Sequence, residues 1–149
     1  MRVKGHQFSR GAVVAAAIVV GAGFGGSAGA ETSLEVGRSE FASYCAACHG
    51  HDGRGDGPFQ VLLTRRVPGL TGLARANGGT FPADRVAEVV RGSVDMPGHG
   101  PMGMPLWGDH YRTKAPSQLG PYFKPEDAEA YVKSRIQGVV DYLATIQEK

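Results

Sequence analysis

Two cysteines and a histidine stand together in the pattern Cys-x-x-Cys-His, as Cys45, Cys48 and His49. This pattern is the attachment site of a c-type haem, in which each sulfur forms a thioether with one vinyl group of the porphyrin. The histidine follows the second cysteine directly, so its imidazole is expected to reach the iron as the proximal ligand. The pattern therefore requires the rest of the chain to supply a second iron ligand and to exclude water.

Two other kinds of site use closely spaced cysteines. Thioredoxin-like redox sites have the same spacing, but they belong to a βαβ arrangement, and no strand-like alternation surrounds this motif. Zinc sites usually add a second tight pair of ligands. The sequence has no such pair, although His51, His99 and His110 are available beside His49. Haem is therefore the preferred interpretation.

Residues 1–30 have the composition of a secretory signal peptide. A basic start is followed by an apolar stretch from Gly11 to Phe24 and by a small-residue cleavage site, Ala28-Gly29-Ala30. A retained membrane anchor is the alternative, but the apolar stretch is shorter than the roughly 20 residues of a spanning helix. We expect cleavage near Ala30, a mature domain over residues 31–149, and no stable membrane insertion afterwards.

The charge balance changes when this leader is removed. The full chain has 16 basic and 14 acidic residues, a net charge of +2. The leader contains three of the basic residues and no acidic one, so the mature chain has 13 basic and 14 acidic residues and a net charge of −1. This balance does not favour nucleic acid as a partner.

The segment from Arg65 to Thr71 contains a proline turn suited to orient the proximal histidine. A ligating histidine usually donates its other ring N–H to a carbonyl or carboxylate, and a proline-containing turn presents a carbonyl rigidly. Pro68 is therefore the expected acceptor. Arg65 and Arg66 are equally expected to pair with a haem propionate or to be solvated surface cations.

A second region, from Asp95 to Asp109, offers the sixth iron ligand. A thioether sulfur is a neutral donor that favours reduced iron and raises the reduction potential. Met104 precedes a proline and stands three residues before Trp107, whose ring is suited to wall the pocket and whose indole N–H is suited to bond a propionate. Met96 also precedes a proline. Four residues compete for the ligand position: Met96, Met102, Met104 and His99.

Apolar residues at helical spacing predict a first helix from Ser33 to Cys48, with Leu34, Gly37, Phe41, Tyr44 and Cys48 along one stripe. A last helix is expected from Pro125 to Gln147. A glycine-rich loop is expected at Gly50–Pro58, followed by a short helical piece at Phe59–Leu63.

Two further segments lie between these elements. One helix is expected to be capped by Thr80, to have Pro82 in its first turn and to end at Gly92. The segment Tyr111–Lys124 contains two prolines and Gly120, which predicts a surface loop.

The chain resembles a monohaem class I cytochrome c of the small bacterial periplasmic type. Three motifs carry this resemblance: the Cys45–His49 pattern, the run Pro68 to Pro82 with its Asn-Gly-Gly turn, and the segment His99-Gly100-Pro101-Met102-Gly103-Met104-Pro105-Leu106-Trp107-Gly108. The resemblance implies an all-α fold, a bundle of about four short helices and loops wrapped around one covalent haem c.

The resemblance also implies the roles of particular residues. It makes Met104 the sixth ligand, although Met102 stands two residues away as an alternative. It places the first and last helices in close contact, with Gly37 and Phe41 against Tyr142. The segment Tyr111–Lys124 is an addition to a minimal cytochrome of this type.

A haem with both axial positions filled has no open position for a substrate, which favours electron transfer over catalysis. We expect a periplasmic electron carrier, or an electron-transfer subunit of a dehydrogenase or oxidase, with redox donor and acceptor proteins as partners. It is expected to be a monomer or a small subunit of a redox complex, and not an enzyme. The alternative is a gas sensor or a peroxidase-like enzyme with a labile sixth ligand, for which His99 is the nearby acid or base.

Overall fold

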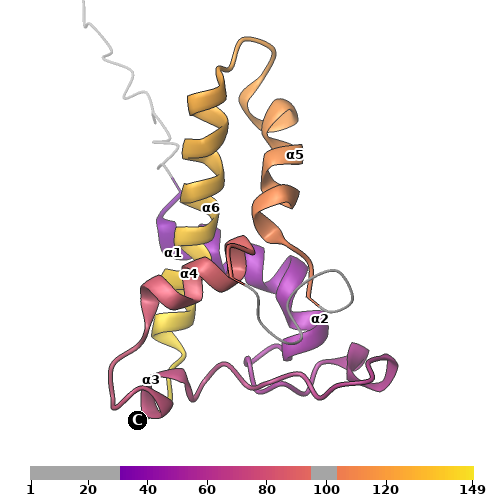
Figure 1. Ribbon diagram of the computed structural model, residues 1–149, viewed down its shortest axis with the longest axis vertical. Coiled ribbons are helices and arrows are strands. Elements are labelled where there is room, and N and C mark those ends of the chain that lie inside the picture. The colour runs from indigo at the N-terminus through magenta and orange to yellow at the C-terminus, as the bar shows by residue number, and fades with distance from the viewer. Residues whose placement is uncertain (1–30, 95–103) are drawn as a thin grey trace, which may run out of the picture.

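The computed structural model describes residues 31–94 and 104–149 (Figure 1). All regular elements in this part of the chain are helical, which confirms the expected fold class. They are α1 (Ser33–Glu40), the π-helix η1 (Phe41–Cys45), α2 (Ala46–His49), the 3₁₀-helix η2 (Pro58–Leu62), α3 (Leu73–Ala76), α4 (Ala83–Arg91), α5 (Trp107–Leu119) and α6 (Pro125–Thr145). The expected leader lies outside the described residues, as do Met96, His99 and Met102.

The expected first helix is present, but it is interrupted by a π turn. Its start is stabilised by a capping box, in which the Glu35 N–H donates to Thr32 Oγ1 and the Thr32 N–H donates to the Glu35 carboxylate. The Ala46 N–H then donates to the Phe41 carbonyl, five residues back. A π turn contains one residue more than an α-helical turn. The buried stripe therefore shifts, and Phe41 and Ala46, five residues apart, are both buried. The prediction that Tyr44 continues the stripe was therefore wrong, since its side chain is exposed.

The glycine-rich loop and the short helical piece after it are present, the latter as the 3₁₀-helix η2. Helix α4 begins at Ala83 with Pro82 as its N-cap, so the prediction that Thr80 caps this helix was wrong. The predicted end at Gly92 is confirmed. Gly92 adopts a left-handed conformation with φ 85°, and its N–H donates to the Glu88 carbonyl.

The prediction of a surface loop over Tyr111–Lys124 was wrong, because most of this segment belongs to α5. Trp107, Tyr111 and Ala115 recur every four residues and are buried along one face of the helix. A proline inside a helix removes one backbone hydrogen bond, but Pro116 lies in the last turns, and the buried face outweighs that loss. The expected bundle of about four short helices is thereby extended by α5.

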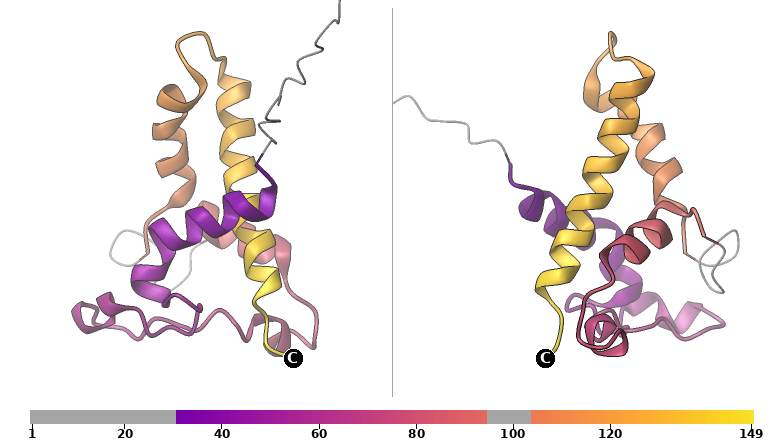
Figure 2. Two further views of the ribbon diagram at one scale, coloured as in Figure 1. Left: turned by 180° about the vertical axis from the view of Figure 1, so that it is seen from behind. Right: turned by 60° about the vertical axis from the view of Figure 1, so that its left-hand side comes forward.

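Helix α6 is the longest element, with 21 residues. It begins at Pro125 as predicted, and the Lys124 N–H donates to the Asp127 carboxylate at 2.9 Å. Its first half lies beside α5 and its middle crosses α1, as the views in Figures 1 and 2 agree. No helix in the described ranges is both long enough and apolar enough to span a membrane.

The crossing of α1 and α6 depends on two glycines. Gly37 lies against Gly138 so closely that a Cβ atom on Gly37 would overlap the Gly138 carbonyl. Beside this crossing, the Phe41 and Tyr142 rings have centroids 5.2 Å apart, which confirms the expected contact between them. The atoms nearest to a Cβ on Gly37 belong to Gly138 and Val139, and the expected contact between Gly37 and Tyr142 stays a prediction.

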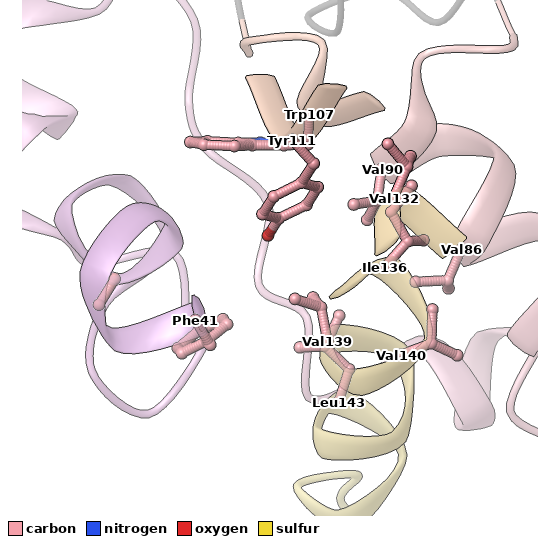
Figure 3. Close-up of a cluster of buried hydrophobic side chains, with 11 residues drawn as sticks. Phe41, Val86, Val90, Trp107, Tyr111, Val132, Ile136, Val139, Val140 and Leu143 are labelled. Atoms are coloured by element: carbon pink, nitrogen blue, oxygen red, sulfur yellow. The ribbon is translucent and has the colours of Figure 1, made fainter. Parts of the chain in front are cut away.

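The core is built around one face of α6 (Figure 3). Phe41 comes from η1, Trp107 and Tyr111 come from α5, and α4 contributes two valines. The buried residues of α4 and α6 in this cluster are Val86, Val90, Val132, Ile136, Val139, Val140 and Leu143. Because η1 leads directly into α2, this packing fixes the position of the Cys45–His49 motif.

Substitution of Gly37 by alanine is expected to lower the free energy of unfolding by about 2–3 kcal/mol through overpacking at the crossing. An alanine in an unobstructed helix interior would instead stabilise it by about 0.5–1 kcal/mol. Chemical denaturation of the purified protein measures the difference. Gly72→Ala is a control at the N-cap of α3, where the added Cβ would meet only the end of the Arg75 side chain. A Gly37→Ala variant as stable as the wild type would contradict the close crossing.

Candidate functional site

The imidazole of His49 is fixed by a backbone carbonyl. His49 is buried at the end of α2, and its Nδ1 lies 3.1 Å from the Pro68 carbonyl oxygen. A carbonyl only accepts hydrogen bonds, so Nδ1 carries the proton in this contact and Nε2 is the nitrogen with the lone pair. This is the tautomer and the orientation that a histidine ligand to a metal requires.

The glycine-rich loop brings the Pro68 turn to His49. The Gly55 N–H donates to the His49 carbonyl at 2.7 Å, and the Gly57 N–H donates to the Cys48 carbonyl at 3.2 Å. Gly55 has a φ of +79°, and a Cβ there would lie 2.5 Å from the Val67 carbonyl oxygen. These two glycines therefore allow close approach between the motif and the Pro68 turn.

Gln60 holds this turn, a role that no sequence pattern predicted. The Val67 N–H donates to Gln60 Oε1 at 2.6 Å, and Gln60 Nε2 donates to the Arg65 carbonyl at 3.2 Å. One side chain therefore fixes the backbone on both sides of residue 66, just before Pro68. A glutamine in a short 3₁₀-helix has no pattern that reveals this role from the sequence.

Cys45 and Cys48 are not bonded to each other. Burial, together with smaller effects of the charges of Glu40 and Cys48, raises the pKa of the Cys45 thiol to about 12. Cysteines of disulfide oxidoreductases have a lowered thiol pKa, so Cys45 lacks the property that such an enzyme needs. Cys45 ends η1, and Cys48 stands in α2 directly before His49, the order of residues in a haem-attachment motif.

Met104 and Trp107 come from the second region that the sequence singles out. Met104 is partly buried and packs against the core just before α5 begins. The Trp107 ring lies 5.3 Å from the ring of Tyr44, the neighbour of Cys45, and 5.1 Å from the ring of His110. The structure thus brings the start of α5 next to the cysteine motif, although they are about sixty residues apart in sequence.

The remaining predicted residues are placed as follows. Arg65 is exposed on the segment before Pro68, and Arg66 is exposed beside it. His110 contributes its ring to the aromatic cluster with Tyr44 and Trp107. Within residues 31–94 and 104–149, no three His, Cys, Asp or Glu side chains are grouped to hold a metal ion.

These residues fit a covalently bound haem c. Two thiols, an imidazole with its Nδ1 hydrogen-bonded and a thioether side chain form a complete donor set for it. The Trp107 side chain provides a further observation, because its indole N–H is buried and has no acceptor among the described residues. A buried donor of this kind is normally satisfied, and a haem propionate is a suitable acceptor.

A family model described as Cytochrome c matches residues 34–147. The match begins in α1, ends just after α6 and includes every site residue discussed above. No match was found among curated proteins or among solved structures.

Gln60→Ala is expected to lower the free energy of unfolding by about 1–2 kcal/mol, because the Val67 N–H and the Arg65 carbonyl lose their partner. Gln60→Glu keeps the acceptor but not the donor, so its free energy of unfolding is expected to lie between those of Gln60→Ala and the wild type. Chemical denaturation provides the comparison.

The matched control for Gln60 is Gln137→Ala, which removes one exposed bond to Asp141 and is expected to change stability by less than about 0.5 kcal/mol. Equal effects of Gln60→Ala and Gln137→Ala would refute the role assigned to Gln60.

Proposed function

We propose that this chain, which belongs to the cytochrome c family, carries one haem c with His49 and Met104 as axial ligands and transfers single electrons in the periplasm. Family membership makes it a haem-based electron-transfer protein and implies covalent attachment through Cys45 and Cys48. The axial pair, the single haem and the location are our proposals.

The observation that carries the proposal is the contact between His49 Nδ1 and the Pro68 carbonyl. It fixes the ring plane and the tautomer, and it increases the basicity of the nitrogen that faces a metal. The loop hydrogen bonds to the His49 and Cys48 carbonyls hold the same segment from the other side. A ligand held this rigidly needs little rearrangement when the charge of the iron changes.

The placement of Met104 supports its role as the second ligand. It is partly buried against the core, and the proline after it and the start of α5 constrain its backbone. A neutral sulfur donor favours the ferrous state and closes the sixth position to small molecules. The bound haem c supplies a one-electron couple between ferric and ferrous iron.

The residues around the motif exclude water from the proposed haem and leave electron transfer to partner proteins as its role. Phe41, Trp107 and the α6 face form a packed apolar core beside the motif, which excludes water from that side. We propose that a donor protein and an acceptor protein dock in turn, and that no substrate chemistry takes place on the chain. A cleaved leader over residues 1–30 would deliver the chain to the periplasm, as a free carrier or as a subunit of a redox complex.

The sulfur–iron bond is tested by the near-infrared charge-transfer band that ferric haem shows when a thioether is bound. We expect the band in the wild-type haem protein and expect Met104→Ala to abolish it, because the sixth ligand is then lost. Met102→Ala and Met96→Ala are the matched controls and are expected to retain the band.

Survival of the band in Met104→Ala would assign the ligand elsewhere. Its absence from the wild type, together with rapid binding of carbon monoxide by the ferrous protein, would favour the gas sensor or peroxidase-like alternative over an electron carrier.

A further inference from the structure

One ion pair differs from the others in the described part of the chain. Arg135 Nη1 on α6 lies 3.2 Å from Glu40 Oε1 at the end of α1, and the two side chains are 24% and 13% exposed. In every other ion pair of the described residues both side chains are at least 36% exposed. Exposed pairs contribute little because water screens them, whereas a buried carboxylate acts on its surroundings over a longer range.

The π turn places this carboxylate on the side of Cys45. The Ala46 N–H donates to the Phe41 carbonyl five residues back, so residues five apart follow one another along the same side of this turn. Glu40 stands five residues before Cys45. An uninterrupted α-helix would align Glu40 with Tyr44 instead, and Tyr44 is exposed.

The second carboxylate oxygen of Glu40 points into the protein. Oε2 is buried, and the Tyr111 side chain of α5 lies within reach of the Glu40 carboxylate. Tyr111 on α5 is buried nearby, and burial together with the charge of Glu40 raises the pKa of its hydroxyl. The charge of Glu40 also raises the pKa of Cys45. The groups that interact with Glu40 are thus Arg135 from α6, Tyr111 from α5 and Cys45 from η1.

We propose that Glu40 is an electrostatic tuning residue, whose carboxylate, held by Arg135 and aligned with Cys45 by the π turn, lowers the reduction potential of the haem attached there. The inference rests on the proposed function. Reduction adds one electron to the iron, so the ferric state has one more positive charge than the ferrous state. A nearby negative charge therefore favours the ferric state. Arg135 opposes this effect only in part, because its side chain is the more exposed of the two.

The reduction potential of the haem-loaded Glu40→Gln variant tests the proposal. The uncharged side chain is expected to shift the ferric–ferrous equilibrium toward ferrous by about three- to tenfold, where a tenfold shift corresponds to about 59 mV for one electron. Glu40→Asp keeps the charge and is expected to stay within about twofold of the wild type.

Glu129→Gln is the matched control, because Glu129 also pairs with arginines but is 54% exposed. It removes the same charge from the surface of α6 and is expected to leave the potential unchanged. Since Glu40→Gln leaves Arg135 without its partner, the double variant Glu40→Gln/Arg135→Gln is measured as well. In this double variant the ferric–ferrous equilibrium is expected to shift toward ferrous, as in Glu40→Gln, but by a smaller factor.

An infrared difference spectrum between the reduced and oxidised forms gives a second readout that does not depend on electron transfer to a partner. A carboxylate that senses the iron charge is expected to contribute a band that Glu40→Gln removes and Glu129→Gln retains.

The proposal is overturned if Glu40→Gln and Glu129→Gln have the same potential and the same infrared difference bands while both carry covalent haem. That result would leave the proposed function intact. A protein that matures without thioether-bound haem would instead refute the proposed function, and this inference with it.

Discussion

The hydrogen bond between His49 and the Pro68 carbonyl is the contact on which the site depends. A histidine side chain turns freely about two bonds, and a metal ligand must have one orientation and one tautomer. The chain meets this requirement with backbone groups. The Gly50–Gly57 loop returns to the motif through hydrogen bonds to the Cys48 and His49 carbonyls, and Gln60 holds the residues that lead to Pro68.

The helices bring the start of α5 next to the cysteine motif. Gly37 and Gly138 allow α1 and α6 to cross with their backbones in contact. The π-helix η1 follows α1 directly and leads into the Cys45–His49 motif. Helix α5 packs along α6, so its first residues, with Met104 just before them, reach the aromatic side chains beside Cys45. Two separate segments of the chain thus supply the two proposed ligands: Met104 packs against the core, and His49 is held by the Pro68 carbonyl.

Features set by short-range spacing were predictable from the sequence. The cysteine motif, the acceptor role of Pro68, the end of α4 at Gly92 and the start of α6 at Pro125 each depend on residues that are close together or on a single proline or glycine. Phe41 and Tyr142 were paired because the family resemblance relates the first and last helices. The role of Met104 as the sixth ligand, which the resemblance implies, stays a prediction.

Features set by packing between distant segments were not predictable. The segment after Trp107 has the composition of a loop, yet it is helical because Tyr111 and Ala115 are buried against α6. The π turn shifts the buried face by one residue, which no periodicity argument anticipates. Glu40 and Arg135 are 95 positions apart, so their burial as a pair appears only when α1 and α6 are placed together.

The most direct test of the central claim is proton nuclear magnetic resonance of the ferrous protein with its methionine methyl groups labelled with carbon-13. If the haem is bound with sulfur on its iron, the ring current of the porphyrin must shift one methionine methyl resonance far upfield, and sequential assignment must trace that resonance to Met104. A spectrum without an upfield methyl resonance, or one whose upfield resonance belongs to Met96 or Met102, would contradict the account.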